Sequence, residues 1–337
     1  MPPLNPFVAV IAAAGLDLLI GDPRWCPHPV VVMGAAIQQL REHVERIAGD
    51  RPGPLRLGGL VITLLMVGGS ILVGWGIEQL TLAQGDRLSA LGAVLLVIGL
   101  ASTLAARSLR DSVLAVIQAI PSNLTGNLER ARQRLSWIVG RDVSGLHVPE
   151  IHRAAAESAS ENAVDGIFAP LFWMLVGAGV WMHAKAWPGP LSLAFGFKAA
   201  STLDSMLGYR TGRLRWLGTA GARLDDLLTW MPCRLVMLTL PLISRPWTEL
   251  ARLVEAAERD GATDPSPNSG RSEAIYAHCA GVQLGGRNRY GDRWVDKPLL
   301  ASGQPCADEQ AVRRILDLSL KLQIAWLSMA LLVWALA

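Results

Sequence analysis

The chain has few cysteines, and no two of them lie close together in the sequence. Among 337 residues there are four, at Cys26, Cys233, Cys279 and Cys306, and no CxxC pair occurs. Structural zinc sites and small disulfide-rich folds are built from closely spaced cysteine pairs. The sequence therefore predicts neither a zinc site nor a disulfide framework, and we expect reduced thiols.

Several other signals are also missing. The sequence contains no GxxxxGK[ST] phosphate loop, no GxSxG nucleophile elbow, no HExxH zinc motif and no dinucleotide-binding glycine fingerprint. The net charge is only +3 and no long cationic run occurs, which argues against nucleic acid as a partner. No Lys or Arg precedes the first apolar residues, so a cleaved signal peptide is not expected. No internal repeat suggests an inverted-repeat transporter.

Apolar residues, by contrast, are abundant. Hydrophobic residues make up 51% of the chain, and the mean hydropathy is positive. The sequence therefore predicts an all-α integral membrane protein, a polytopic helical bundle with sizeable cytoplasmic loops that forms one membrane-embedded domain over residues 1–337. The apolar segments are 7–20, 57–77, 88–106, 163–183, 191–207, 227–243 and 315–337.

Segments 57–77 and 88–106 are the clearest membrane spans, and a short turn that carries Glu78 separates them. We expect an antiparallel hairpin, and small residues within the two segments would permit close approach of helices. Those residues are Gly58, Gly59, Gly68, Gly69, Gly92 and Gly99. Ahead of this hairpin, residues 22–30 read DPRWCPHPV, and their prolines predict a rigid loop.

Segment 227–243 is harder to interpret, because it is apolar but contains Arg234, Pro232 and Pro241. Proline inside a helix removes a backbone hydrogen bond and kinks or breaks the helix. We therefore expect a broken or re-entrant helix here, or a neighbouring segment that does not span. Basic loops face the cytoplasm, so we expect loops 107–160 and 244–314 on that side, together with residues 208–226.

The most informative stretch is 152–173, in which carboxylates precede a long apolar run. On a helix, Glu157, Glu161 and Asp165 fall at i, i+4 and i+8 and share one face. Like charges at this spacing destabilise a helix, and no Lys or Arg follows them before Lys185. A bound cation such as Mg²⁺, or basic side chains from elsewhere in the fold, should neutralise them. The alternative is an ordinary solvated polar face.

Other polar groups lie within or beside the apolar segments. Lys198 and Asp204 are six residues apart, too far round a helix to pair well, so we expect their partners on other segments. The polar clusters combine carboxylates, Arg, Lys, Asn, Ser and Gly, the groups that bind a magnesium-bound phosphate ligand. The pair Gly285-Gly286 is a weak signal by itself, because most such pairs are turns.

Five motifs occur in order between Asp17 and about Asp292: DLLIGDPRWCPHPVVVMGAAI, VGRDVSGLHVPEIHRAAAESASENAVDGIFAPLFW, KAASTLDSMLGYR, GARLDDLLTWMPCRL, and SPNSG followed by GVQLGG. Together they resemble the CobD/CbiB family of cobalamin biosynthesis, the membrane-bound adenosylcobinamide-phosphate synthases. Three positions depart from the family's pattern: Thr229 stands where Asn is expected, Cys233 where Ala is expected, and Asp264-Pro265 where a pair containing His is common.

The resemblance implies amide formation, dependent on ATP and Mg²⁺, between the corrinoid adenosylcobyric acid and (R)-1-aminopropan-2-ol phosphate or threonine phosphate. ATP would activate the acid most simply as an acyl phosphate. The candidate catalytic residues are Glu157, Glu161, Asp165, Asp204, Asp225 and Asp226. Glu157, Glu161 and Asp204 are also the candidate Mg²⁺ ligands. The candidate substrate and phosphate-binding residues are Asn162, Lys198, Arg210, Arg223, Ser266, Asn268 and Arg271.

Other interpretations stay open for some of these residues. Asp225 and Asp226 could be helix N-terminal charges, residues 266–268 a plain turn, and Arg210 and Arg271 anchors at the membrane surface. For the whole chain we expect a multi-pass protein of the inner (cytoplasmic) membrane, in contact with the lipid bilayer, with its active site facing the cytoplasm.

Two other functions are alternatives. A polytopic membrane transporter would use Lys198, Asp204 and Arg234 as intramembrane charges. A membrane phosphotransferase of the CDP-alcohol type also places carboxylates at a membrane face. Its DGxxAR…GxxxDxxxD spacing is absent here, because Asp165-Gly166 is followed by Ile-Phe-Ala-Pro.

Overall fold

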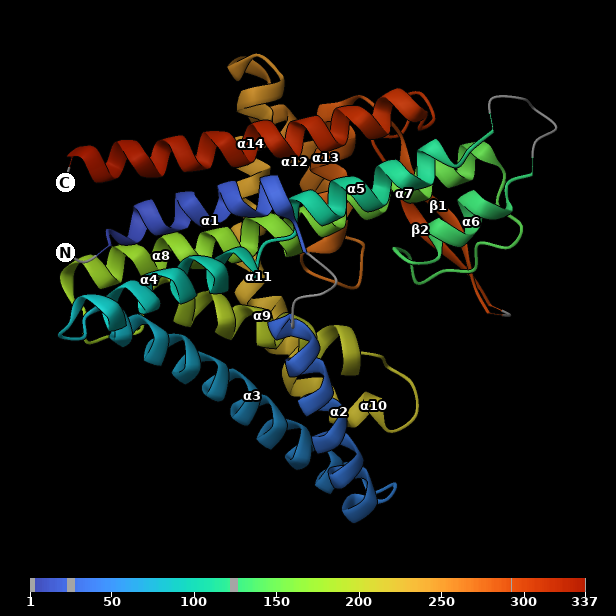
Figure 1. The fold of residues 1–337 in the computed structure, drawn as a ribbon. Coiled ribbons are helices and arrows are strands. Elements are labelled where there is room, and N and C mark those ends of the chain that lie inside the picture. Colours follow the sequence, from blue (N-terminus) through green and yellow to red (C-terminus); the bar gives the residue numbers. More distant parts are fainter. Residues whose placement is uncertain (1–3, 23–27, 122–126, 292, 337) are drawn as a thin grey trace. The chain divides into compact units, whose positions relative to one another are not determined.

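The computed structural model describes residues 4–22, 28–121, 127–291 and 293–336, and most of them are helical (Figure 1). The contacts divide the chain into two compact units. Unit 1 comprises Met1–Ala105, Ala169–Thr229 and Leu327–Ala337, and unit 2 comprises Ala106–Phe168 and Trp230–Trp326. The predicted all-α class is confirmed, with one small two-stranded sheet among the described residues. One membrane-embedded domain over the whole chain stays a prediction, and the part of the expected rigid loop at 23–27, with Cys26, lies outside the described residues.

The described residues include five helical stretches that are long and apolar enough to cross a membrane. They are Pro52–Thr81, Asp86–Gln118, Val148–His183, Thr219–Ser244 and Glu309–Ala335. These stretches suggest a multi-pass membrane protein. The shorter apolar helix Pro6–Ile20 matches the first predicted segment.

Unit 1 is entirely helical in its described residues. It contains α1 (Pro6–Ile20), α2 (Pro29–Ala48), α3 (Pro52–Thr81), α4 (Asp86–Ala101), α8 (Ala169–His183), α9 (Pro190–Leu207) and α10 (Leu214–Leu217), with the start of α11 (Thr219–Ser244) and the end of α14 (Glu309–Leu336). Local sequence sets several of these bounds. The side chains of Asn5 and His28 cap α1 and α2, proline is the first residue of both helices, and Gly21 and Gly49 end them at positive φ.

Helices α3 and α4 pack against each other, as the expected hairpin requires. Gly92 lies against the backbone of Leu80 and Thr81, so the prediction of close approach is confirmed there. A Cβ at Gly68 or Gly69 would meet no described atom within 4 Å, so the prediction is wrong for these two residues.

Glu78 is a fully buried carboxylate in the last turn of α3, not part of the turn that follows. Its oxygens accept hydrogen bonds from the backbone N–H groups of Gly189, Leu191 and Ser192 at 2.8, 2.7 and 3.0 Å, and from the Ser192 hydroxyl at 2.6 Å. These N–H groups begin α9 and have no partner within that helix. The helix dipole also favours a carboxylate here. The long-range cap explains why α3 runs on to Thr81.

Unit 2 contains the only described strands. Its elements are α5 (Ala106–Gln118), α6 (Glu129–Leu135), α7 (Val148–Ala163), the π-helix η1 (Val164–Phe168), the rest of α11, the 3-10 helix η2 (Trp247–Glu249), α12 (Leu250–Gly261), α13 (Ser269–Ala280), β1 (Leu284–Tyr290), β2 (Arg293–Leu300) and most of α14. Helix α7 packs against α5, α13 and β1. The stretches expected as loops 107–160 and 244–314 are therefore largely built from helices and a hairpin.

Helix α11 is continuous through Pro232 and Pro241, so the predicted break is wrong. Proline at position 232 leaves the carbonyl of Leu228 without its helical donor. The indole N–H of Trp173 donates to that carbonyl instead, at 3.1 Å. A tertiary hydrogen bond thus replaces the lost helical one, which is how proline is tolerated inside membrane helices.

The positive charge of Arg234 is also stabilised by nearby groups, although this residue lies in the apolar helix α11. Its Nη1 donates to the carbonyl of Pro267 and to Oδ1 of Asn268, both at 2.9 Å. Its guanidinium lies 4.9 Å from the centre of the Trp230 ring, in a cation–π contact. These contacts within unit 2 account for the charge at this position.

Candidate active site

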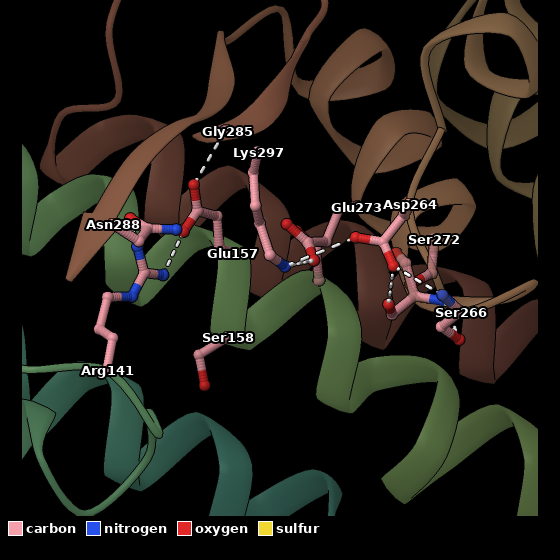
Figure 2. Close-up of polar contacts among 12 residues, drawn as sticks. Arg141, Glu157, Ser158, Asp264, Ser266, Ser272, Glu273, Gly285, Asn288 and Lys297 are labelled. Carbon is pink, nitrogen blue, oxygen red and sulfur yellow. Dashed lines mark hydrogen bonds and ion pairs between the residues drawn. The ribbon is translucent and has the colours of Figure 1, made fainter. Parts of the chain in front are cut away.

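A small pocket in unit 2 collects charged side chains from several elements (Figure 2). Its volume is about 100 Å³, and its polar lining includes Arg141, Glu157, Ser158, Glu161, Glu273 and Lys297. They come from the loop before α7, from α7 itself, from α13 and from β2. Sites that enclose a whole cofactor measure roughly 300 Å³ or more. This pocket is therefore the right size for a small charged group.

Glu157 is the most firmly held residue of the pocket. It lies on the buried face of α7, where Oε1 accepts the backbone N–H of Gly285 at 2.8 Å. Oε2 accepts a hydrogen bond from the guanidinium of Arg141, and Nη1 of Arg153 lies 3.6 Å from Oε1. The side chains of Glu157 and Arg141 are only 5% and 8% exposed. Two arginines thus neutralise Glu157: Arg141, from outside the stretch 152–173, as one of the two predictions has it, and Arg153, one turn before Glu157 on the same helix.

Asn288 of β1 joins the two arginines that contact Glu157. Its Oδ1 accepts a hydrogen bond from Arg141 and another, at 3.1 Å, from Nη2 of Arg153. The side chain is buried, and its Nδ2 has no hydrogen-bond partner among the described residues. A buried amide donor without an acceptor is costly, and a ligand oxygen would satisfy it.

The β-hairpin reaches Glu157 through an irregularity in its register. Strands β1 and β2 are antiparallel, and the pairing shifts between Leu284 and Gly286. Gly285 and Gly286 both have positive φ, of 82° and 95°, which glycine adopts easily. The bulge directs the N–H of Gly285 to Glu157. The glycine pair, which looked like a plain turn in the sequence, is therefore part of the candidate site.

Lys297 of β2 lies among carboxylates. Figure 2 shows its ammonium directed at Glu273 and Asp264, with Nζ 3.4 Å from Oε1 of Glu273 and 3.7 Å from Oδ2 of Asp264. Burial opposes the charged form of Lys297, but the nearby carboxylates outweigh burial and raise its pKa. For Glu273, burial outweighs the attraction of Lys297 and raises the pKa to about 8. Near neutral pH the lysine is therefore charged and Glu273 mostly protonated.

Glu161 differs from these residues because no described side chain or backbone group binds its carboxylate. It lines the pocket one helical turn after Glu157 and is half-buried. Lys297, Asp264, Glu157 and Arg141 are its charged neighbours. Within the described part of the chain, no hydrogen bond or ion pair engages its carboxylate. The pocket therefore contains one carboxylate that can accept a proton or a ligand without first breaking a contact.

Asp165 does not join the other two carboxylates. The regular helix ends at Ala163, and Asp165 lies in the π-helix η1, which has more residues per turn. The expected stripe therefore covers only Glu157 and Glu161, and Asp165 is not part of the pocket lining. Asn162 is exposed and donates Nδ2 to the carbonyl of Ser158, four residues earlier, at 2.9 Å.

Three other predicted binding residues lie in the turn before α13 and in the first turn of that helix. Oγ of Ser266 accepts the backbone N–H groups of Asn268 and Ser269 at 3.2 and 3.3 Å. Asn268 is buried and accepts from Arg234 through Oδ1. Arg271 forms a two-point pair with Glu258, at 2.7 and 2.6 Å. Ser266 and Asn268 thus have the local turn role that the sequence left open, and Arg271 is neutralised within the protein.

The remaining predicted residues belong to unit 1. Asp204 and Lys198 lie on α9, and Asp225 and Asp226 on α11. Asp225 attracts Lys198, so the expected partner on another segment is confirmed for Lys198. For Asp204 a partner of opposite charge stays a prediction, because its neighbours on α11, Asp225 and Asp226, are like charges. These residues form a second acidic cluster, in unit 1. Arg210 and Arg223, also of unit 1, are exposed.

The described side chains do not form a metal site. Among them, no group of three or more His, Cys, Asp or Glu residues is arranged to hold an ion. Carboxylates such as Glu273 and Asp264 are suitable Mg²⁺ ligands, but here they face the Lys297 ammonium. Of the predicted ligands, Glu157 is already engaged by Arg141 and Gly285, and a metal role for Asp204 of unit 1 stays a prediction. The described residues around the pocket therefore do not fit a protein-bound Mg²⁺ ion.

Several charged or polar residues that line this pocket, or that contact its lining, were not predicted as site residues. Arg141, Glu273 and Lys297 line it, and Arg153, Asp264, Gly285 and Asn288 contact the lining residues. Most of them lie 100 residues or more from Glu157 in the sequence, so no local spacing links them to it. One signal was present: no Lys or Arg follows the three carboxylates before Lys185, which indicates that cations come from elsewhere in the chain.

Comparison with known proteins gives a consistent result along nearly the whole chain. The family model described as CobD/Cbib protein matches residues 10–319. The "Cobalamin biosynthesis protein CobD" of Synechocystis sp. is 39% identical over 340 residues, covering 99% of this chain and 92% of that protein. The CobD protein of Klebsiella pneumoniae is 38% identical, covering 94% of this chain and 92% of that protein. The "Cobalamin biosynthesis protein CbiB" of Salmonella typhimurium is 37% identical, covering 95% and 94%. No solved structure matches.

Proposed function

Because the chain belongs to the CobD/CbiB family of cobalamin-biosynthesis proteins, we propose that it is an adenosylcobinamide-phosphate synthase. In this reaction, the carboxyl group of adenosylcobyric acid is joined to the amine of (R)-1-aminopropan-2-ol phosphate, or of threonine phosphate, at the expense of ATP. The observation that carries the proposal is the unit 2 pocket, in which an unengaged Glu161 lies beside the cations Lys297 and Arg141. Amide formation from ATP and an amine that bears a phosphate requires cations that bind the phosphates and a base that removes a proton from the amine.

The cations suit the phosphate chemistry. ATP supplies the phosphoryl group that activates the carboxylate, because a free carboxylate does not react with an amine in water. Glu157 and Asn288 hold the Arg141 guanidinium in place. This guanidinium and the Lys297 ammonium would bind phosphate oxygens and stabilise their negative charge. The unpartnered Nδ2 of Asn288 adds a neutral donor. Mg²⁺ enters this proposal only as the ion that accompanies ATP.

Glu161 would act as the general base. The amine of the second substrate is protonated near neutral pH and attacks only after losing a proton. A base must be within hydrogen-bond reach of that proton, and general-base catalysis contributes roughly 10²–10⁴-fold to a rate. Glu161 is the pocket carboxylate that accepts no described hydrogen bond. Glu157, by contrast, is already engaged by Gly285 and Arg141 and positions the latter.

The size of the pocket limits what enters it. At about 100 Å³ it admits a phosphate or an amine end but not a corrin ring or a whole nucleotide. The larger parts of the reactants would therefore lie outside it. We also propose that the pocket faces the cytoplasm from the inner membrane, since ATP and phosphorylated amino alcohols are soluble cytoplasmic compounds.

The test is coupling by the purified full chain. Protein in detergent is incubated with adenosylcobyric acid, ATP, Mg²⁺ and either aminopropanol phosphate or threonine phosphate, and the amide is detected by its mass. We expect ATP-dependent product with one of the amines and a loss of about 100-fold or more in Glu161→Gln. Glu129→Gln, at a 74% exposed carboxylate, is the matched control and should keep parental activity.

Two results would count against the proposal. Folded parent protein that forms no amide with either amine would reject the reaction itself. Full activity in Glu161→Gln would leave the reaction in place but remove Glu161 as the base.

A further inference from the structure

A second pocket in unit 2 shares no lining residue with the candidate active site. Its volume is about 460 Å³, within the range of small-ligand sites. The end of α11, the C-terminal end of α13 and the first part of α14 surround it, and its charged lining residues are Arg245, Arg314, Asp317 and Lys321.

The protein compensates the positive charge of this basic pocket only in part. Asp317 is the one acid among the described lining residues, and it pairs with Arg110 at 3.0 Å. Within the described part of the chain, no ion pair involves Arg245, Arg314 or Lys321. Three cations and one carboxylate thus line the cavity, and the carboxylate is shared with Arg110. The net charge is positive, and a bound anion would offset the repulsion between the cations.

Capping of α13 explains only part of this arrangement. Nε of Arg314 donates to the carbonyl of Ala280, the last residue of α13, at 3.2 Å. The guanidinium of Arg245 lies near Gly281, which ends that helix. Cations at a helix C-terminus are favourable. However, this role leaves the Nη atoms of Arg314 without a described partner, and it gives no role to Lys321, which lies two turns further along the same face of α14.

The remaining lining points to an anion rather than a metal ion. Cys279 lines the pocket, and burial raises the pKa of its thiol to about 11, so the thiol stays protonated near neutral pH. A neutral thiol is neither a metal ligand nor a strong nucleophile. Guanidinium and ammonium groups around a cavity bind phosphate oxygens well.

The surroundings of the pocket resemble a membrane surface. Helices α11 and α14 are both candidate membrane spans. On α11, Leu238 and Leu242 are 45% and 51% exposed shortly before the pocket, and on α14 Ile324 is 51% exposed just after Lys321. Trp247, 78% exposed, follows Arg245, and tryptophan is enriched where a bilayer meets water. Exposed apolar residues therefore border the cations on both helices.

We propose that this basic pocket binds a phosphate group and that the phosphate belongs to the headgroup of an anionic phospholipid. Basic pockets between membrane helices bind such headgroups. The site does not depend on the function proposed above, because it uses none of the active-site residues. It would hold unit 2 against the bilayer surface through Arg245, Arg314 and Lys321.

The test measures lipid binding to the delipidated full chain in detergent. Native mass spectrometry follows titrations with dioctanoyl phosphatidylglycerol, dioctanoyl phosphatidylcholine and inorganic phosphate. We expect phosphatidylglycerol to bind in preference to phosphatidylcholine, with affinity about tenfold lower in Arg314→Gln and in Lys321→Gln. Arg313→Gln is the control, because it removes the same charge from a neighbouring residue that pairs with Glu309 and does not line the pocket.

Each outcome decides one point. Inorganic phosphate that binds with the same sensitivity to Lys321→Gln, while neither lipid binds, supports the phosphate site and rejects the lipid as its source. Phosphatidylglycerol affinity that is unchanged in both pocket variants, or that falls equally in Arg313→Gln, overturns the site. Lys321 makes no described side-chain hydrogen bond or ion pair, so Lys321→Gln tests the pocket without disturbing the fold.

Discussion

Glu157 and Glu161 lie one turn apart on α7, yet their surroundings give them different chemistry. Glu157 is buried in an ion pair with Arg141 and accepts the N–H of Gly285. Glu161 faces the same pocket without a described partner. Two carboxylates that look equivalent in the sequence thus separate into a positioning residue and a candidate base.

The buried ion pair of Glu157 with Arg141 predicts a large effect on stability. Removing one partner of a buried ion pair leaves the other charge uncompensated and costs about 3–5 kcal/mol. Glu157→Gln and Arg141→Gln should each lower the free energy of unfolding by that order, and the double variant should lose less than their sum. Asp111→Asn breaks an exposed pair with Arg107 and should cost roughly 0.2–1 kcal/mol. Unfolding of the four variants in detergent measures these values, and strictly additive losses would show that Glu157 and Arg141 are not coupled.

Glu273 predicts a pH dependence of stability. Burial raises the pKa of Glu273 from 4.5 to about 8, so between these values the folded protein keeps a proton that the unfolded chain has released. Its contribution to stability is therefore complete below about pH 4.5 and is lost as the pH rises to about 8. Lys297 does not titrate in this window, because its pKa is raised from 10.5.

Thermal unfolding at pH 5 and pH 8 measures this effect. We expect the unfolding midpoint of the parent to fall between the two values and that of Glu273→Gln to fall less. Glu258→Gln is the control, because hydrogen bonding to Arg271 lowers the pKa of Glu258 and places its titration below the window. A Glu273→Gln variant with the full parental pH dependence would contradict the assignment.

At the scale of elements, the bulge in β1 connects the hairpin to α7. Gly285 has φ of 82°, and a Cβ on this residue would collide with the carbonyl oxygen of Pro298 across the hairpin. The bulge cannot keep its shape with a side chain at this position. The hydrogen bond from Gly285 to Glu157 depends on that shape.

Gly285→Ala should therefore lower both stability and coupling activity. Gly303→Ala is a matched control: Gly303 also has positive φ, of 87°, but a Cβ there meets no described atom within 4 Å. The control should lose only the cost of a left-handed residue, about 1–2 kcal/mol, and keep its activity. Equal losses of stability and activity in the two variants would show that the bulge does not support the site.

Helix α9 shows a comparable long-range effect in unit 1. A single carboxylate from α3, Glu78, accepts three backbone N–H groups and a hydroxyl at the start of α9. No capping side chain within α9 could provide this, because Gly189 and Pro190 begin the helix. A buried charge that looked like a turn residue in the sequence thus anchors two helices of the unit to each other.

For the whole molecule, the natural cysteines provide a test of orientation. Cys306 is exposed, whereas Cys233 and Cys279 are buried. If the stretch 244–314 faces the cytoplasm, a membrane-impermeant maleimide should label Cys306 in inverted membrane vesicles and not in intact cells. Cys26→Ser provides the background, and the added change Cys306→Ser should abolish labelling. Labelling of Cys306 in intact cells would place this stretch outside.

The sequence alone was sufficient for the helical class, for the positions of the long apolar helices and for the family. Helices begin and end by local signals, such as the prolines that begin α1 and α2 and the glycines that end them, and membrane helices carry their apolar pattern within one segment. The continuous α11 was missed because Leu228 and Trp173, which compensate Pro232, are far apart in the sequence. The ordered helices and hairpin of 244–314 were missed because basic composition alone suggested a loop.

The candidate site needed the tertiary structure for a related physical reason. Local periodicity placed Glu157 and Glu161 on one face, but a charge acquires its role from groups within a few ångströms, wherever they lie in the sequence. Folding brings Arg141, Gly285 and Lys297 to α7, and it ends the regular helix before Asp165. The sequence determined which charges require partners, and only the packing of α7 against α13 and the hairpin decided which partners they have.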